Sequence, residues 1–180
     1  MRSLTIVFVI ILFSCRSYCQ SNNAIVDSLV KLAAISDSVG DLQTSIRYYS
    51  SILQIDSLRL VALVNRGRAF ISLGQLDSGF VDYSRAIRHY PNEQVYCARG
   101  MAYCMTNNYS KAFNDFIVAK HLNPKSGGAY YGLSLIKIHD GQLKYASDFC
   151  RKADSIAYNP ELSEAIRREI KKKTEEIKEK

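Results

Sequence analysis

Much of what a catalytic or metal-binding protein needs is missing from this sequence. It contains no Gly-rich phosphate-binding loop, no nucleophile elbow and no HExxH helix. Its three histidines, His89, His121 and His139, are scattered, and the His, Cys and Asp residues lack the spacing that suits a metal. We therefore expect a protein that is not an enzyme and that has no catalytic residues, no cofactor and no metal.

Paired cysteines are missing as well. Of the five cysteines, Cys97, Cys104 and Cys150 belong to the part expected to fold, and an odd number cannot pair fully within one chain. Cys97 and Cys104 are seven residues apart on one expected helix, a rise of about 10 Å against a Cα limit of roughly 7 Å for a disulfide. There is no CxxC spacing for redox or metal chemistry. We expect these cysteines to serve as small apolar residues between helices.

No apolar run is long enough to cross a bilayer, which takes about 20 residues. The run from Leu4 to Phe13 has about half that length and is apolar except for Thr5. It follows a positively charged start and precedes small and polar residues, which is typical of an export signal. Residues 1–19 are therefore predicted to be such a signal; the alternatives are a buried N-terminal helix or a short anchor.

Two cleavage sites are compatible with this signal. Leu12-Phe13-Ser14-Cys15 resembles the lipobox of bacterial lipoproteins, with Phe13 in place of the usual small residue, and predicts lipidation of Cys15. Alternatively, Ser17 and Cys19 precede an ordinary cut that leaves Gln20 as the first residue. Both alternatives predict a protein that is exported and lies in the periplasm or on the outer membrane, with residues 20–25 as a short tether.

A concentrated patch of one charge is also absent. The formal net charge is +7. Residues 21–159 carry fifteen basic and eleven acidic side chains, and residues 160–180 carry seven and six. Nucleic-acid binding needs a concentrated basic face, so this dispersed excess predicts no nucleic-acid partner.

What the sequence does contain is a repeat. The stretch from Leu60 to Glu93 reads as two short helices, and its pattern returns 33 residues later. The recurring residues are Gly67, Phe70, Gly74, Gly79, Tyr83, Ala86 and Pro91, followed by Gly100, Tyr103, Asn107, Ala112, Phe116, Ala119 and Pro124. The small residues let the two helices approach, and the aromatic residues fill the space beside them. Pro91 and Pro124 are expected to end the second helix of each unit.

Two less regular copies flank this pair, and a charged segment follows. The predicted boundaries are 26–59, 60–92, 93–126 and 127–159 for the repeats and 160–180 for a C-terminal helix. Gly40, Gly74, Asn107 and Gly141 share one position, the turn between the two helices, where Asn tolerates the positive φ that the turn needs. Asn159-Pro160 is typical of a helix start.

A period of 33 to 34 residues with two helices is the tetratricopeptide arrangement, and the chain resembles that family from Val26 to Pro160. It departs from the family pattern in lacking the leading Trp, which is replaced by Leu29, Leu63, Tyr96 and Tyr130. The resemblance implies an all-α fold: a right-handed α-α superhelix, or solenoid, of four helix-turn-helix repeats with a C-terminal capping helix.

The resemblance also implies a concave groove lined by the first helix of each repeat. The predicted partner-groove residues are Lys31, Val64, Asn65, Arg68, Cys97, Met101, Tyr131 and Leu135. Asn65 matches one residue of the family's carboxylate clamp, but the other clamp positions do not match, so that clamp is not expected. The predicted role is a protein-protein interaction module or scaffold in the cell envelope that binds a peptide or helix of a partner.

An alternative role remains open at this point. The chain would be a membrane-tethered structural lipoprotein that joins a larger envelope complex through its convex face or its C-terminal helix. Its only link to the membrane would then be the lipid anchor on Cys15. The sequence predicts neither the oligomeric state nor the identity of the partner.

Overall fold

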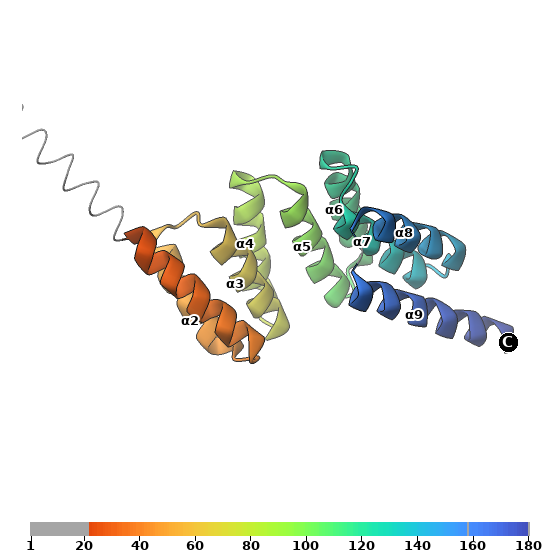
Figure 1. Ribbon diagram of the computed structural model, residues 1–180, viewed down its shortest axis with the longest axis horizontal. Helices are drawn as coiled ribbons and strands as arrows, with labels where there is room; N and C mark the ends of the chain where they lie inside the picture. Colours follow the sequence, from red (N-terminus) through yellow and green to blue (C-terminus); the bar gives the residue numbers. More distant parts are fainter. Residues whose placement is uncertain (1–21, 158, 180) are drawn as a thin grey trace, which may run out of the picture. The chain divides into compact units, whose positions relative to one another are not determined.

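The computed structural model describes residues 22–157 and 159–179, and within those residues every regular element is a helix (Figure 1). The first helix spans residues 22–38. The others are α2 (Leu42–Ile55), α3 (Leu60–Ser72), α4 (Leu76–His89), α5 (Glu93–Met105), α6 (Tyr109–Leu122), α7 (Gly127–His139), α8 (Leu143–Ile156) and α9 (Pro160–Lys178). The predicted all-α class is confirmed for the part of the chain that is described.

The described part of the chain divides into two compact units, residues 22–82 (unit 1) and residues 83–157 with 159–179 (unit 2), and the division falls between Asp82 and Tyr83 in the sequence of α4. In unit 1, α2 packs against α3. In unit 2, each helix from α5 to α8 packs against the next, and α9 packs against both α7 and α8.

The turn inside each helix pair has one backbone conformation in all four repeats. Gly40, Gly74 and Gly141 have φ of 78°, 75° and 72°, and Asn107 has φ of 58°. A Cβ disfavours this left-handed region, and Gly and Asn are the residues that enter it most readily. The prediction that Asn107 replaces glycine at this turn is confirmed.

Polar side chains begin several of the helices. Asn92, Asn108, Ser126 and Asn159 each accept a hydrogen bond from the backbone N–H three residues ahead. These bonds satisfy N–H groups that have no partner within the helix. Helices α4 and α6 end two residues before Pro91 and Pro124, as the proline positions predicted.

Phe116 forms the centre of the core in unit 2. Its ring is fully buried with Ala112, Leu133 and Ile136. A methyl group added at Gly132 would lie 2.2 Å from the Phe116 ring, and one at Gly100 would lie 2.8 Å from it. Glycine on both neighbouring helices is therefore what makes room for this aromatic ring.

At the N-terminus the helix begins earlier than predicted. Residues 20–25 were expected to be a tether, but residues 22–25 are already helical. Ser28 supports this first turn because its hydroxyl donates to the Ala24 carbonyl at 2.9 Å. Polar residues are tolerated there because N–H groups of a first turn can bond to water. The predicted export signal, including Cys15, lies outside the described residues.

Candidate functional site

The predicted groove residues fall into two sets, one in each unit. Unit 1 contains an exposed Lys31 on the first helix, with Val64 and Asn65, both half-buried, and Arg68 on α3. Unit 2 contains the other four residues, Cys97, Met101, Tyr131 and Leu135, on α5 and α7.

In unit 1, Asp37 holds Arg68 in place. Its Oδ2 accepts hydrogen bonds from Arg68 at 3.0 Å and from the Tyr49 hydroxyl at 3.0 Å, and its Oδ1 accepts one from Ser45 at 2.5 Å. The Arg68 side chain is nevertheless 57% exposed. The structure thus presents a guanidinium whose position is fixed on one side and which is open to solvent on the other.

Tyr49 contributes to this arrangement as a neutral donor. Burial, and then the hydrogen bond to Asp37, raise the pKa of Tyr49 to about 12. The hydroxyl therefore stays protonated near neutral pH and keeps donating to Asp37. Arg68 can attract a carboxylate, while Tyr49 is neither a base nor a nucleophile at that pH.

In unit 2, three of the predicted groove residues are half-buried against the core. Cys97 and Met101 pack against the cluster around Phe116. Leu135 packs against the cluster that includes Ile166. Burial raises the pKa of Cys97 to about 11, so its thiol is protonated at neutral pH. These side chains contribute to packing, which was the expectation for Cys97 as a small apolar residue between helices.

Tyr131 does not belong to an exposed groove, and that part of the site prediction is corrected. The residue is 3% exposed. Its hydroxyl donates to Asp154 at 2.6 Å and accepts from the Asn159 N–H at 3.1 Å. The spacing within the repeat pointed toward the groove, but α8 and the segment that leads into α9 bury the side chain. A partner cannot contact it while α9 is in place.

Asp154 links α8 to α9 through hydrogen bonds that were not predicted from the sequence. In addition to the bond from the Tyr131 hydroxyl, its carboxylate accepts hydrogen bonds from Ser163 at 2.9 Å and from Arg167 at 2.6 Å. Burial favours a higher pKa, but these three hydrogen bonds outweigh it and lower the pKa of Asp154. The spacing of Ser163 and Arg167 on one face of the expected helix was the available signal, but it does not identify their acceptor.

Two buried ion pairs were also missed. Arg66 bonds Asp82 through two nitrogens at 2.7 and 2.8 Å, and Arg99 bonds Asp115 at 2.8 and 2.8 Å. Both aspartates are buried. Arg66 recurs as Arg99, and Asp82 recurs as Asp115, each 33 residues later. This recurrence of an Arg and an Asp at fixed repeat positions could have predicted the two ion pairs. These charges are satisfied within their own units and serve the fold.

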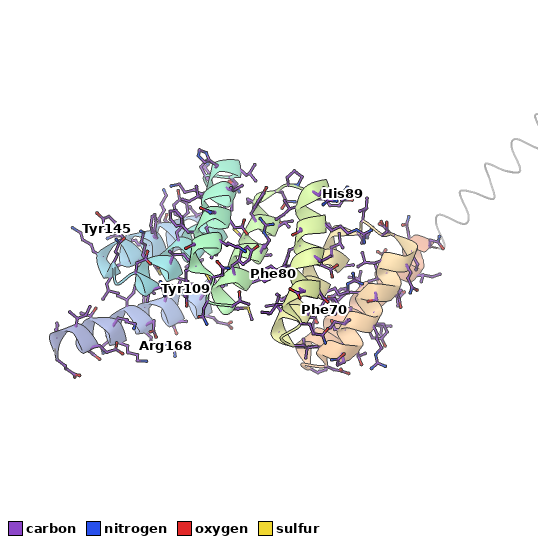
Figure 2. The ribbon with its side chains drawn as sticks, turned by 180° about the vertical axis from the view of Figure 1, so that it is seen from behind. Phe70, Phe80, His89, Tyr109, Tyr145 and Arg168 are labelled. Atoms are coloured by element: carbon purple, nitrogen blue, oxygen red, sulfur yellow. The ribbon has the colours of Figure 1, made fainter. Side chains whose placement is uncertain are left out.

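A surface hollow of about 380 Å³ lies between α6 and α7 in unit 2. Its wall includes Tyr109, labelled in Figure 2, whose ring stacks on His139 at 3.7 Å. Ser110, His139 and Asp140 all line this hollow. However, His139 bonds Asp140 at 3.2 Å and is not hydrogen-bonded to Ser110, so among the described residues this set does not form a nucleophilic triad.

The described residues hold no group of three His, Cys, Asp or Glu side chains arranged to bind a metal ion. None of the helices in this part of the chain combines the length and the apolar character that crossing a membrane requires.

Comparisons with known proteins agree with the repeat pattern. The chain is 31% identical over 107 residues to Tetratricopeptide repeat protein 12 of Mus musculus, covering 59% of this chain and 15% of that protein. It is 24% identical over 157 residues to Tetratricopeptide repeat protein 6 of Homo sapiens, covering 84% of this chain and 30% of that protein. It thus spans less than a third of the length of either relative.

The fold has matches among solved structures. The structure of PilF from Pseudomonas aeruginosa has a TM-score of 0.73 at 15% identity and covers 88% of this chain and 72% of that one. No family model matches the chain. The 33-residue period, the paired helices and the curated relatives together support the resemblance of the chain to the tetratricopeptide-repeat family.

Proposed function

We propose that this chain is a non-enzymatic protein-binding module of the cell envelope that binds an acidic peptide segment of a partner. Tetratricopeptide folds generally mediate protein-protein interaction. The binding surface proposed here is in unit 1 and is defined by Lys31, Val64, Asn65 and Arg68.

The observation that carries the proposal is the exposed guanidinium of Arg68, which Asp37 fixes at 3.0 Å. Positioning a long side chain in advance reduces the entropy that a partner must remove on binding. A guanidinium can bond a carboxylate through two parallel N–H groups, and an exposed Lys31 adds positive charge. A carboxylate-bearing segment is therefore the partner chemistry that this surface favours.

The test compares two arginines of unit 1. Arg68→Gln removes the positive charge from the proposed surface, and Arg47→Gln removes one from α2, where the exposed Arg47 side chain donates to Thr44. With the purified chain as bait on an envelope extract, we expect Arg68→Gln to reduce retention of bound proteins at least about tenfold. Arg47→Gln should leave it unchanged. Equal retention by wild type and Arg68→Gln, with unchanged thermal stability, would reject this surface.

The cellular location is part of the same proposal. The apolar run from Leu4 to Phe13 supports export, and Cys15 supports a lipid anchor. Intact-mass measurement of the chain recovered from expressing cells separates the alternatives. A lipid-modified Cys15 at the N-terminus supports tethering, a start at Gln20 supports a soluble exported chain, and an unprocessed Met1 start would reject export by this signal.

A further inference from the structure

One face of the first helix exposes a row of large aliphatic side chains. The helix over residues 22–38 buries Val26, Ala33 and Ser36 on one side. Its other side, continued by the turn after it, exposes Ile25, Leu32, Ile35 and Val39, which are between 43% and 74% exposed. We call these four residues, together with Ser28, the N-terminal stripe. Apolar residues gathered on one face mark an interaction surface, whereas single exposed ones do not.

The spacing of the N-terminal stripe is that of a helix-pairing seam. Residues 25, 28, 32, 35 and 39 follow each other at alternating intervals of three and four, which keeps them on one side of a helix. Ser28 is the one polar member. The stripe therefore suits a helix lying along it.

The later repeats show what normally covers this face. Ile35 occupies the repeat position of Ala69 in α3 and of Ile136 in α7, and both of those residues are buried. In unit 2, Ile136 lies in one cluster with Ala112 and Phe116 of α6, the helix that precedes it. In unit 1, α2 precedes α3 and packs against it. Among the described residues, the first helix has no such predecessor, and Ile35 is 60% exposed.

We propose that the N-terminal stripe is the contact surface between two copies of this chain, paired antiparallel about a twofold axis. A second stripe of matching apolar character is needed to cover the first. Elsewhere in the described helices the exposed aliphatic residues do not form such a row, so the stripe of a second copy is the complement that the molecule offers. Identical patches that face each other form a closed twofold interface.

Charge favours the antiparallel direction. Asp27 and Lys31 lie one turn apart on the same flank of the stripe. An antiparallel twofold pair brings that flank of each copy together. With Ile25 opposite Ile35 of the second copy, Lys31 lies near Asp27 of the second copy. Asp27 is exposed and already forms an ion pair with Arg59 at 3.6 Å. In the pair of chains it also faces a lysine, on both sides of the axis.

The interface is short, because 17 helical residues extend only about 25 Å. Such an interface belongs to the weak, reversible class. We therefore expect a monomer-dimer equilibrium with a dissociation constant of about 1 to 100 µM. Lys31 belongs to both proposed surfaces, whereas Ile35 belongs to the stripe alone and Arg68 to the partner-binding surface alone. Variants at Ile35 and at Arg68 therefore let either proposal fail without the other.

The experiment is sedimentation equilibrium of the purified chain from about 1 to 500 µM, with a matched pair of variants. Ile35→Asp places a charge in the stripe, and Ile177→Asp makes the same change at a site in α9 that is also 60% exposed. We expect Ile35→Asp to weaken dimerisation at least about tenfold, while Ile177→Asp leaves it unchanged. Circular dichroism checks that both variants keep their helix content.

A charge exchange tests the direction of pairing. Lys31→Asp or Asp27→Lys alone should weaken the dimer, and the two together should restore it. A chain that stays monomeric at 500 µM, or a dimer that Ile35→Asp does not weaken, would overturn the proposal. The first result would mean that another occupant, such as the chain's own N-terminal residues or another protein, covers the stripe.

Discussion

At the residue scale, the two arginine-aspartate pairs show that the residue type tolerated at one position depends on the residue type at the position it contacts. Asp115 is buried and bonds Arg99 through both carboxylate oxygens. The Arg99 guanidinium also lies 5.8 Å from each of the Tyr96 and Tyr103 ring centres. In the fourth repeat the same two positions hold Leu133 and Phe149, which belong to one apolar cluster. The fold thus accepts either a matched ion pair or a matched apolar pair at this place.

A double-mutant cycle tests this dependence. We expect Asp115→Phe alone to lower the free energy of unfolding by about 3 kcal/mol, because it leaves the arginine charge without its carboxylate. Adding Arg99→Leu should recover at least half of the loss. Urea unfolding followed by circular dichroism measures both effects. A double variant no more stable than the single one would show that the pair is not energetically coupled.

The glycines of α7 give a second residue-scale prediction. A methyl group at Gly132 would meet the Phe116 ring at 2.2 Å, whereas one at Gly128 would find Cys97 Sγ at 3.6 Å, an ordinary contact. We expect Gly132→Ala to lower the free energy of unfolding by about 1 to 3 kcal/mol, because the added methyl group overpacks the core. Gly128→Ala should leave the free energy of unfolding unchanged or raise it slightly. Thermal melts of both variants decide this. Equal melting temperatures would mean that Phe116 can move aside.

At the element scale, the attachment of α9 combines apolar packing with a polar cluster. Leu162, Ile166 and Ile170 pack against the last repeat, and Asp154 bonds Ser163 and Arg167 of the same helix. The three-and-four spacing of the aliphatic residues made the packing predictable. The polar cluster was not predictable, because its acceptor lies on α8 and the angle between α8 and α9 decides which side chains meet.

This cluster should give α9 a pH-dependent stability. Burial favours a higher pKa for Asp154, but its hydrogen bonds outweigh burial and lower that pKa. The carboxylate's contribution to the free energy of unfolding is therefore fully present above the pKa of an unfolded aspartate, about 4. That contribution is lost as pH falls through the lower folded value. We expect Asp154→Ala to lower the free energy of unfolding by about 1 to 3 kcal/mol at pH 7. The loss should become progressively smaller below about pH 4.

The matched control for this prediction is Asp148→Ala on the same helix, because Asp148 is exposed and pairs with Arg151, which is also exposed. Urea unfolding at pH 7, 4 and 3 measures both variants against wild type. If the difference in free energy of unfolding between wild type and Asp154→Ala stays constant down to pH 3, the ionised carboxylate of Asp154 does not stabilise the attachment of α9.

At the scale of the whole molecule, charge is unevenly divided along the chain. Residues 22–82 carry five basic and six acidic side chains, whereas residues 83–180 carry seventeen and eleven. The basic excess of unit 2 is dispersed, and in α9 Lys171 and Lys173 lie 4.0 and 3.6 Å from Glu175 and Glu176. Exposed charges of this kind are largely screened beyond about 8 Å at physiological salt.

We therefore expect no useful affinity for nucleic acid. In fluorescence anisotropy with a 20-base-pair duplex at 150 mM salt, the dissociation constant should exceed about 100 µM. Weak binding at 20 mM salt, lost on adding salt, is compatible with this expectation. Submicromolar binding at 150 mM would contradict the expectation and point to a basic face that the dispersed charges do not suggest.

Three features follow from the sequence alone: the repeat, the all-α class and the turn at Asn107. They depend on local chemistry, because helix periodicity, a left-handed turn residue and proline after a helix recur wherever the chain repeats. The burial of Tyr131 and the exposure of Ile35 became visible only in the folded molecule. Both outcomes depend on whether a neighbouring helix covers the position, and a single repeat's sequence does not contain that neighbour.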